Sequence, residues 1–343
     1  MIRVGVVGCG RISERHFEVF RELKDRIKLV AVCDKIKEKA ERWADEFGVT
    51  GYTDYAEMLD KETFDLMSIC TPSGLHPKHG AMAANKKINV LSEKPMAVTL
   101  EGANELIRAC DDNDVKLFVV KQNRLNPPIR LLKKAIDKNR FGKIFMANAT
   151  VFWQRPQDYY NAAEWRGKWE FDGGAFMNQA SHYVDLIQWL VGPVDYVTAV
   201  TGTLARQIET EDTGAALLKF RSGAIGVIQV TMLTYPKNYE GSITILGETG
   251  TVKIGGNAVN KVEKWDFEKY DDDDAAVNDV NYSTKSVYGF GHKGYYENVL
   301  DVLKNKSKAT TDGREGKKSI ELILAIYKSA KAKSIVPLPL DNN

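Results

Sequence analysis

The sequence has few cysteines, no long apolar run and almost no net charge. Four of its 343 residues are cysteines, and none of them belongs to a C-x-x-C pair. So few thiols are typical of a chain that keeps them reduced and buried in the cytoplasm, which is where we expect this protein. No apolar run approaches the roughly 18 residues that a membrane helix requires. The N-terminal sequence MIRVGVVGCG also lacks the apolar core of a secretion signal.

The charge balance argues against a protein that binds nucleic acid or membranes, and the histidine positions argue against a metal site. The chain carries 48 basic and 46 acidic residues, so its net charge of +2 gives no bulk attraction to nucleic acid or to a membrane surface. An anionic ligand must then be held by a local site. His76 and His79 form an i, i+3 pair, but no cysteine or acidic residue stands close by in the sequence. We therefore expect no metal.

The clearest motif is a glycine turn after the apolar run that opens the chain. The hexapeptide GCGRIS, residues 8–13, has the form G-x-G-x-x-S. Gly8 permits a tight turn, Gly10 lets the backbone approach a pyrophosphate, and Ser13 is small enough for close helix packing. Asp34 ends the next apolar run, 24 residues after Gly10, near the offset of about 20 for a ribose-binding acid. A carboxylate there accepts from a ribose 2′-hydroxyl and repels a 2′-phosphate, so the pattern predicts NAD.

The first part of the chain alternates strands with helices. Further apolar, strand-like runs occur at 65–70, 89–92 and 115–120. Such alternation predicts a doubly wound parallel sheet, in which ligands bind at the carboxyl ends of the strands. The turns at 8–13, 71–76, 93–95 and 121–124 are all expected at those ends. Lys94 lies in one of them, directly after a strand and before Pro95, which fixes the turn and is able to adopt the cis form.

The alternation stops near Gln122, where a second domain begins. After a helix over 129–136, strands are expected at 144–152, 194–203, 213–221, 224–233, 241–247 and 251–255. A run of strands predicts an open, mostly antiparallel sheet in an α+β domain. One face of that sheet is open to packing against a second copy, so we expect a homo-oligomer, a dimer or a tetramer. The predicted domains are a Rossmann domain over 1–122 and a substrate-binding and oligomerisation domain over 123–343.

The stretch 173–189, GGAFMNQASHYVDLIQW, is expected to form a glycine turn that leads into one helix. Its predicted buried face consists of Phe176, Ala180, Val184, Ile187 and Val191. Asn178, His182 and Asp185 lie at i, i+4 and i+7 and share another face. Histidine titrates near neutral pH, so His182 is a candidate for moving a proton. The alternative interpretation is that His182 is a structural residue of the core, with its ring hydrogen-bonded within the protein.

The segment 153–172, which precedes this helix, is rich in aromatic and charged residues. Its candidates for holding an anion are Arg155, Arg166 and Lys168. Its candidates for stacking on a ligand ring are Trp153, Tyr159, Tyr160 and Trp165. A loop at a subunit interface is the alternative, and both interpretations can hold.

Three features lie toward the C-terminus. The acidic run 271–274 predicts a solvated loop. His292 begins a helical segment that could return to the ligand-binding cleft. A last helix is expected over 316–333.

Three motifs therefore occur together: the GxGxxS turn, the sequence Glu93-Lys94-Pro95 and a GG-x7-His-x-x-Asp helix. Over nearly the whole chain this combination resembles the glucose–fructose oxidoreductase / inositol dehydrogenase / MocA (Gfo/Idh/MocA) family. The resemblance implies a Rossmann domain, an α+β domain and NAD-dependent hydride chemistry on a sugar or polyol carbon. It implies that Lys94 contacts the reacting hydroxyl and that His182 is the acid or base. Many members carry aspartate four residues before that histidine, whereas this chain has Asn178. The proton chemistry is then left to His182 and Lys94, without that carboxylate.

A narrower resemblance is to the bacterial UDP-N-acetyl-glucosaminuronate 3-dehydrogenases. It rests on residues 121–128, on the loop WQRPQDYYNAAEWRGKWEFDGG and on the segment NQASHYVD. It implies oxidation of the C3 hydroxyl of UDP-N-acetyl-D-glucosaminuronic acid during synthesis of lipopolysaccharide O-antigen with 2,3-diacetamido uronic acids. The 3-keto product would then be the substrate of a pyridoxal-phosphate aminotransferase. Some of these enzymes regenerate bound NAD with 2-oxoglutarate, which is therefore a candidate second substrate.

Together, the motifs and the resemblance imply two sets of ligand-binding residues. The cofactor is expected to contact Gly8, Gly10, Arg11, Ile12, Asp34, Thr71, Ser73, His76, Glu93, Lys94, Gln122, Trp165 and Arg166. The substrate is expected to contact Lys94, Asn123, Arg155, Tyr160, Arg166, Lys168, Asn178, His182 and His292. One alternative is an NAD-dependent dehydrogenase of a free sugar or inositol, which needs no site for uridine diphosphate. Another is a non-catalytic NAD-binding regulator, which would not need both Lys94 and His182.

Overall fold

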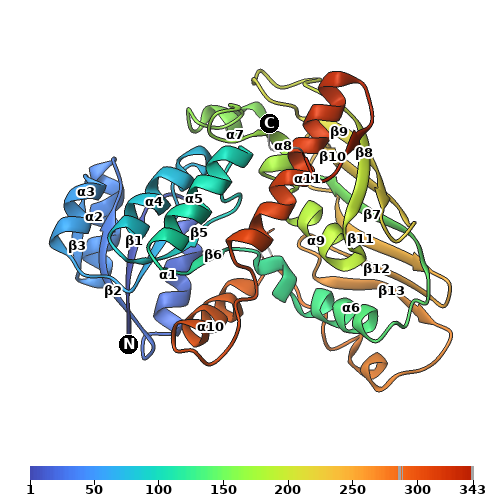
Figure 1. Ribbon diagram of the computed structural model, residues 1–343, viewed down its shortest axis with the longest axis horizontal. Helices are drawn as coiled ribbons and strands as arrows, with labels where there is room; N and C mark the ends of the chain where they lie inside the picture. Colours follow the sequence, from blue (N-terminus) through green and yellow to red (C-terminus); the bar gives the residue numbers. More distant parts are fainter. Residues whose placement is uncertain (285–286, 288, 341–343) are drawn as a thin grey trace. The chain divides into compact units, whose positions relative to one another are not determined.

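The chain forms two compact units in a computed structural model (Figure 1). The structure describes residues 1–284, 287 and 289–340. The first unit contains residues 1–120 and 292–317, and the second contains the described residues of 121–291 and 318–343. The expected boundary after residue 122 lies close to the first crossing between the units. Residues 292–317, however, were expected in the second domain and pack in the first unit.

The returning segment is held at the edge of the first unit's sheet. It contains helix α10 (Gly291–Leu303) and the beginning of α11 (Gly313–Ala332). The Val119 N–H donates to the Thr311 carbonyl at 3.3 Å, and the Tyr295 hydroxyl donates to the Val119 carbonyl. Periodicity in the sequence reveals a helix but not the sheet on which it packs, which is why the segment was assigned to the other domain.

The first unit is a doubly wound parallel sheet, as predicted. Its strands are β1 (Ile2–Val7), β2 (Ile27–Cys33), β3 (Thr50–Tyr52), β4 (Leu66–Ile69), β5 (Asn89–Ser92) and β6 (Leu117–Val119). Its helices are α1 (Ser13–Glu22), α2 (Lys37–Phe47), α3 (Tyr55–Lys61), η1 (Ser73–Leu75), α4 (His76–Asn85) and α5 (Leu100–Asp112). The strands are parallel and follow the order β3-β2-β1-β4-β5-β6. The order reverses between β1 and β4, and in such sheets ligands bind at that switch point.

Local sequence rules explain these elements. All of β4 is buried, as expected for a strand covered on both faces. Helix α5 buries Ala103, Leu106 and Cys110, which recur at helical spacing. The Thr99 side chain caps α5 by accepting the Gly102 N–H at 3.1 Å. Apolar periodicity and a single hydroxyl thus set the position of this helix.

The cysteines are free, buried thiols, as predicted. They are Cys9, Cys33, Cys70 and Cys110. Burial raises the pKa of Cys9, Cys33 and Cys110 to about 12. The thiols therefore stay neutral at physiological pH and pack as small apolar side chains.

The second unit contains a large sheet with helices on one face (Figure 1). Its strands are β7 (Ile144–Phe152), β8 (Val194–Gly202), β9 (Thr213–Phe220), β10 (Ile225–Thr231), β11 (Glu240–Gly247), β12 (Gly250–Gly255), β13 (Lys261–Phe267) and β14 (Val336–Pro337). Its helices are η2 (Gln122–Leu125), α6 (Pro127–Asp137), α7 (Gln157–Asn161), α8 (Gly174–Met177), α9 (Ser181–Val191), η3 (Asp272–Ala276) and the end of α11. Within the described chain, no helix has both the length and the apolar character needed to cross a membrane.

The sheet of the second unit is mostly antiparallel, as predicted. Its order is β13-β12-β11-β7-β10-β9-β8-β14, and the pair β7 and β10 is parallel. Helix α9 packs against β7 and β11, and α8 packs against β10. The edge strands β13 and β14 were not identified from the sequence. Charged residues break the apolar pattern of β13, and β14 is only two residues long.

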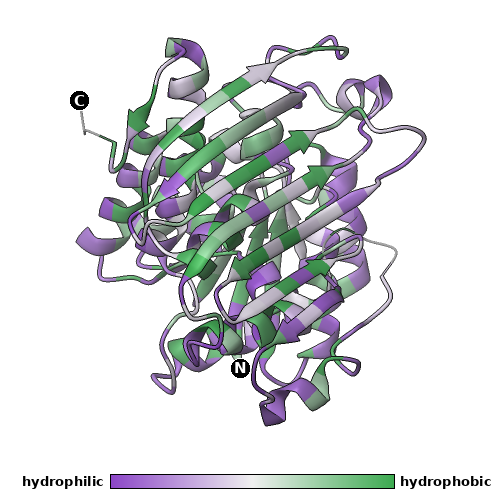
Figure 2. Cartoon of the chain, turned by 90° about the vertical axis from the view of Figure 1, so that its right-hand side faces the viewer, coloured by the Kyte–Doolittle hydropathy of each residue, from purple (hydrophilic) through white to green (hydrophobic). Residues whose placement is uncertain are grey.

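Most of the opposite face of this sheet lies open in Figure 2, where apolar and polar residues alternate along the strands. Val200, Leu217 and Ile225 lie on this face and are 76%, 53% and 48% exposed. Side chains of this kind gathered on an open sheet are typical of an interaction surface.

The stretch 173–189 forms two helices, α8 and α9, instead of the single helix predicted. The Ala180 N–H donates to the Ala175 carbonyl at 2.8 Å, one residue beyond the α-helical partner, and the helix breaks there. His182 and Asp185 are as buried as the apolar side of α9, because η2 packs against them. The helix is therefore buried almost all round, and its polar groups meet protein partners.

The acidic run 271–274 was predicted to be a solvated loop, and this is wrong. The run forms most of η3, and its side chains pair with basic residues on and just after α6. The pairs are Lys134 with Asp273, Lys138 with Asp271, and Arg140 with Asp274. The basic partners lie more than 100 positions earlier in the sequence, where a local charge pattern does not reveal them.

Candidate functional site

The glycine turn after β1 fits a dinucleotide. Gly8 has a φ of +92°, and a Cβ there would lie 2.6 Å from the Cys70 carbonyl group, so only glycine fits. No described atom lies within 4 Å of the place of a Cβ on Gly10, so the turn is open on that side. Ser13 is fully buried, and its hydroxyl donates to the Gly10 carbonyl at 2.6 Å. No described side chain caps α1, and a helix N-terminus without such a cap suits a phosphate group.

Asp34 stands at the end of β2 with its carboxylate fixed by the backbone. The Cys9 N–H donates to Oδ2 at 2.8 Å, and the Ile36 N–H donates to Oδ1 at 2.9 Å. The carboxylate is thus oriented beside the glycine turn, where a ribose-binding acid is expected. Arg11 is exposed and Ile12 is half-buried in the same turn.

We expect Asp34→Asn to reduce the preference for NAD⁺ over NADP⁺ by about 10- to 100-fold, because a charge-assisted hydrogen bond contributes about 1.5–3 kcal/mol. The amide keeps an acceptor for the backbone and removes the charge that repels a 2′-phosphate. The measurement is kcat/KM for both cofactors. Asp25→Asn, which changes an exposed carboxylate in the same unit, serves as the control. An unchanged ratio in the Asp34 variant would contradict the assignment.

The turn after β5 carries Lys94, which is half-buried and joined to Pro95 by a cis peptide bond. The ring nitrogens of His76 lie 2.7 Å from the carbonyl oxygens of Pro95 and Thr71. His76 therefore ties the turn after β4 to the turn after β5. Burial lowers the pKa of His76, although both carbonyls favour the charged ring. Because both nitrogens contact backbone, His76 supports these turns and has no ring nitrogen to offer a cofactor.

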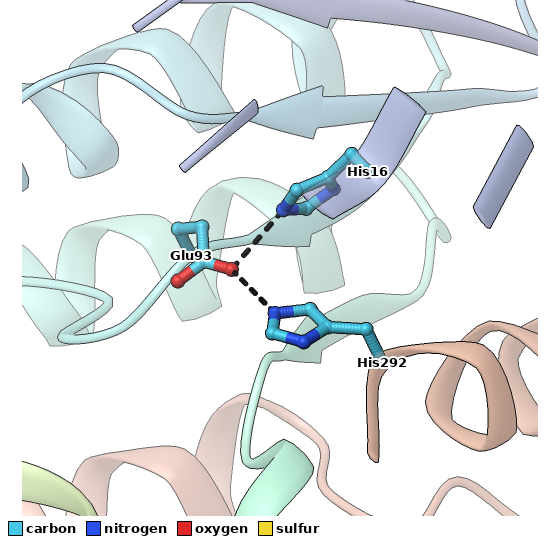
Figure 3. Close-up of side chains that lie close together, drawn as sticks. All are labelled: His16, Glu93 and His292. Carbon is cyan, nitrogen blue, oxygen red and sulfur yellow. Dashed lines mark hydrogen bonds and ion pairs between the residues drawn. The ribbon is translucent and has the colours of Figure 1, made fainter. Parts of the chain in front are cut away.

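Glu93 and His292 were expected to contact the cofactor and the substrate, but they lie buried beside each other (Figure 3). They are 3% and 5% exposed. Glu93 Oε1 lies 3.1 Å from His16 Nε2 and 3.8 Å from His292 Nε2. Glu93 Oε2 accepts the Lys94 N–H at 3.0 Å. Both oxygens of this carboxylate face protein groups, so Glu93 is placed to act through the turn.

In the second unit, His182 lies at the start of α9 and is 7% exposed. Gln122 Nε2 lies 3.0 Å from His182 Nε2. An amide nitrogen can only donate, so the tautomer assigned from this partner has a lone pair on Nε2 and the hydrogen on Nδ1. In this assignment the Nε2 lone pair accepts the Gln122 amide hydrogen.

Behind His182, Asp185 forms a buried ion pair with two cations. Arg124 donates to both Asp185 oxygens at 2.7 and 2.8 Å, and Lys121 Nζ lies 3.6 Å from Asp185 Oδ1. Lys121 also donates to the Ser319 hydroxyl at 2.6 Å. Burial disfavours the Asp185 carboxylate, but Lys121 and Arg124 outweigh it and lower its pKa to about 2. The sequence analysis missed both cations, although they lie one and two positions from the proposed cofactor contact at Gln122.

Several buried polar atoms of the second unit have no hydrogen-bond partner among the described residues, and three of them belong to expected ligand contacts. They are Gln122 Oε1, Asn123 Oδ1 and Arg166 Nε. Buried polar atoms nearly always find a partner, either in the protein or in a bound molecule. The sequence analysis selected these three residues as ligand contacts, and their incomplete hydrogen bonding is compatible with that role, although Asn148 and Tyr183, which it did not select, share the feature.

The loop 153–172 brings two cations to one aromatic ring. The guanidinium carbons of Arg155 and Arg166 lie 5.3 and 4.3 Å from the centroid of the Tyr159 ring. Tyr160 is 5% exposed and packs edge-on against Tyr159, so it serves the loop's own packing. Two cations held beside a ring suit the recognition of an anion.

Four further residues were expected to contact a ligand, and they differ in how exposed they are. Trp165 and Thr71 are half-buried, Lys168 is exposed, and Ser73 is 6% exposed. Thr71 Oγ1 lies 3.0 Å from His79 Nδ1. None of these placements by itself argues for or against a ligand.

Asn178 ends α8, and its amide donates to Asp172 Oδ1. Asp172 is 1% exposed, and its Oδ2 accepts the Gly167 N–H at 2.7 Å. An aspartate at position 178 would place a second carboxylate against this one, so an amide suits the position. The polar face that Asn178 and His182 were expected to share is not formed, because the helix breaks between them.

Glu211 is a buried acid that the sequence analysis missed. Its Oε1 accepts from the Phe176 N–H at 2.8 Å and from the Tyr327 hydroxyl at 2.9 Å. Its Oε2 has no hydrogen-bond partner among the described residues. Burial raises the pKa of Glu211 to about 7, and nearby Asp172 adds to the effect. Glu-Asp-Thr before a strand gives no sign of such burial, so the sequence held no signal for it.

The raised pKa of Glu211 predicts a loss of stability with rising pH. Below pH 4.5 the carboxyl is protonated in both states, and between pH 4.5 and about 7 only the folded protein keeps the proton. The free energy of unfolding should therefore fall by about 3 kcal/mol over this window relative to Glu211→Gln. Urea unfolding at several pH values measures the difference. Parallel curves for the two proteins would show that Glu211 does not titrate in this range.

A parallel sheet with a glycine turn at its switch point and an acid after the second strand defines a dinucleotide-binding oxidoreductase fold. Residues 2–121 match the model described as "Oxidoreductase family, NAD-binding Rossmann fold". Residues 133–338 match "Oxidoreductase family, C-terminal alpha/beta domain" of the same Gfo/Idh/MocA group. The chain belongs to this oxidoreductase family, and its cofactor is NAD(H). The family resemblance inferred from the motifs is confirmed.

Two solved structures are similar over the whole chain. The WlbA dehydrogenase of Bordetella pertussis, in complex with NADH and UDP-GlcNAcA, is 53% identical with a TM-score of 0.97 and covers 99% of this chain and 98% of its own. The WlbA dehydrogenase of Chromobacterium violaceum, in complex with the same two molecules, is 49% identical with a TM-score of 0.95, over 99% and 96%. A myo-inositol 2-dehydrogenase of Thermotoga maritima is 24% identical over 98% of each chain.

Proposed function

We propose that this protein uses NAD⁺ to oxidise the C3 hydroxyl of UDP-N-acetyl-D-glucosaminuronic acid to a ketone. The observation that carries the proposal is the similarity, at 53% and 49% identity over nearly the whole chain, to two dehydrogenases solved with NADH and UDP-GlcNAcA. The inositol dehydrogenase is similar at only 24% identity. A nucleotide-sugar substrate is therefore favoured over a free polyol.

The chain supplies binding, proton transfer and charge stabilisation. NAD⁺, when bound, provides the acceptor for the hydride. Gly8, Gly10 and Asp34 fit its pyrophosphate and ribose through the open turn and the oriented carboxylate. His182 accepts the hydroxyl proton, and Lys94 stabilises the negative charge that develops on the substrate oxygen.

The substrate is an anion, and the second unit offers cations for it. Arg155 and Arg166 are held beside Tyr159, and Lys168 is exposed on the same loop. We assign these cations to the uronate carboxylate or the diphosphate. A free sugar or inositol would not need them, which separates this proposal from its nearest alternative.

The test is NADH absorbance after NAD⁺ is mixed with UDP-N-acetyl-D-glucosaminuronic acid, with scyllo-inositol and glucose as comparisons. Reduction with the nucleotide sugar alone is expected. Reduction only with a free polyol would keep the family chemistry and overturn the substrate. Binding of NAD⁺ without reduction by any of the three would favour a non-catalytic regulator.

The same assay addresses the second substrate. We infer that 2-oxoglutarate reoxidises the reduced cofactor, so its addition should remove the NADH signal while the keto sugar continues to accumulate. A persistent NADH signal would contradict this inference. We place the reaction in the cytoplasm, because four free, buried cysteines suit a reducing compartment.

We infer that the open face of the second unit's sheet joins copies of the chain into a dimer or tetramer. Exposed Val200, Leu217 and Ile225 suit an interface better than solvent. Leu217→Glu, which places a charge in the middle of this face, should therefore give a smaller particle in light scattering. Lys24→Glu, which changes charge at an exposed residue of the first unit, serves as the control. A wild-type particle with the mass of one chain would overturn the inference.

A further inference from the structure

A buried group of titratable side chains in the first unit surrounds Glu93. We call Glu93, His16 and His292 the Glu93 cluster (Figure 3). Their exposed fractions are 3%, 0% and 5%. They come from the end of β5, from α1 and from the start of α10, so three separate segments contribute to it. Such a group is costly to bury unless its members satisfy one another.

A chain of hydrogen bonds leads into the cluster. Ser68 Oγ lies 2.8 Å from the Tyr296 hydroxyl, which lies 2.6 Å from His16 Nδ1, and His16 Nε2 lies 3.1 Å from Glu93 Oε1. An ionised carboxylate can only accept, so His16 Nε2 must donate to it. A neutral ring then accepts at Nδ1 from Tyr296, which in turn accepts from Ser68. Each donor in this chain points toward Glu93.

The cluster holds Glu93 as an anion despite its burial. Burial by itself would raise the pKa of Glu93, but the hydrogen bond from His16 and the nearby His292 ring outweigh it and lower the pKa well below the usual range. The charged carboxylate then accepts the Lys94 N–H through Oε2 at 3.0 Å. The turn that carries Lys94 is thus tied to the cluster by its first peptide group.

The other side of the same turn is also fixed. His76 Nδ1 lies 2.7 Å from the Pro95 carbonyl oxygen. The peptide before Lys94 is therefore held by the Glu93 carboxylate and the peptide after Pro95 by His76, which leaves little freedom for the backbone between them. A reacting group held in this way requires little reorganisation at the moment of reaction.

We propose that Glu93, with His16 and His292, is a positioning residue that sets the place of Lys94 for the reaction. The inference rests on the proposed catalytic role of Lys94. Glu93 does not touch the substrate in this assignment, and it acts only through the Lys94 peptide. The three side chains also offer one metal-ligand atom each within 4.8 Å of one another. The 3.1 Å contact between Glu93 and His16 already has hydrogen-bond length, so the hydrogen-bonded cluster is favoured over a metal site.

The test compares Glu93→Gln with His16→Phe and His16→Gln. Glutamine at position 93 cannot accept from both His16 and Lys94, and phenylalanine at position 16 removes the donor to Glu93. We expect both variants to lower kcat by about 10- to 100-fold, with KM for the nucleotide sugar and Kd for NAD⁺ within about twofold of wild type. His16→Gln restores a donor and should recover most of kcat. Glu105→Gln, an exposed carboxylate on α5, is the matched control.

The outcomes separate this inference from the proposed function. Full turnover in Glu93→Gln and His16→Phe, when Lys94→Met is inactive, would overturn the positioning role alone. Full turnover in Lys94→Met would overturn the proposed chemistry. If KM and Kd rise and thermal stability falls together with kcat, Glu93 has a general structural role. That result would also overturn the positioning role. Stoichiometric zinc or iron in the purified protein, with activity lost to a chelator, would show that the cluster is a metal site instead.

Discussion

Replacing His182 by asparagine is expected to lower kcat by about 10²- to 10⁴-fold, the usual contribution of a positioned acid or base. The proton of the reacting hydroxyl needs an acceptor, and the imidazole of His182 is the group that we assign to this role. Asparagine is polar and small enough for the site but does not accept a proton near neutral pH. The measurement is the steady-state rate with saturating NAD⁺ and nucleotide sugar.

The His182 result needs evidence that the fold and the cofactor site are intact. Kd for NAD⁺ should stay within about twofold of wild type, because the glycine turn belongs to the first unit. Gln188→Ala, a half-buried change on the same helix, is the control for α9. Undiminished turnover in His182→Asn would mean that the buried imidazole is a structural residue, the alternative that the sequence left open.

Replacing Asp185 by leucine is expected to destabilise the protein by about 3–5 kcal/mol, because it leaves buried cations without their counter-charge. Arg124 and Asp185 are each 3% exposed and share two hydrogen bonds, and Lys121 is equally buried at 3.6 Å. The low pKa of Asp185, about 2, means that this stabilisation is fully present above pH 3.8 and is lost as the pH falls through 2. Urea unfolding at neutral pH measures the effect.

The compensating variant distinguishes the ion pair from simple loss of packing. Combining Asp185→Leu with Arg124→Met and Lys121→Met removes all three charges and should recover most of the lost stability, since apolar groups of similar volume often replace a buried ion pair without cost. If the triple variant is no more stable than Asp185→Leu alone, the cost lies in packing. If Asp185→Leu is as stable as wild type, the ion pair does not stabilise the fold.

Asn178 stands where many members of the family carry an aspartate, and the surrounding structure accounts for this difference. The sequence indicated only that a carboxylate was missing four residues before His182. The structure shows that Asp172 supplies a buried carboxylate at this place and that the Asn178 amide donates to it. Asparagine thus avoids two adjacent buried carboxylates, which would not both ionise.

The fold could be predicted from the sequence where the signal was local. Glycines at 8 and 10, the acid at 34 and the alternation of apolar runs are read within a few residues, and they indicated the parallel sheet and its ligand-binding edge. The alternating strands of the second unit were equally clear. The return of residues 292–317 to the first unit could not be predicted, because helical periodicity carries no information about the sheet on which a helix packs.

The candidate site was predictable in its residue types but not in its hydrogen bonds. His16 was not selected from the sequence. It lies at helical spacing with Ile12, Phe20 and Leu23, and an imidazole on such an apolar stripe was the one signal that it had a buried partner. That partner, Glu93, is 77 positions away in sequence. His76, Glu93 and His292 were selected as ligand contacts, yet each faces protein groups that only the three-dimensional structure reveals.

The most direct test of the central claim uses substrate that carries deuterium at C3 of the glucosaminuronate ring. If the protein oxidises that carbon, the reduced nicotinamide recovered from the reaction carries the deuterium, and the rate falls by a primary isotope effect when hydride transfer limits turnover. Mass spectrometry of the cofactor reads the result. Reduced cofactor without deuterium would mean that another carbon reacts, and no reduction at all would contradict the assignment of the substrate.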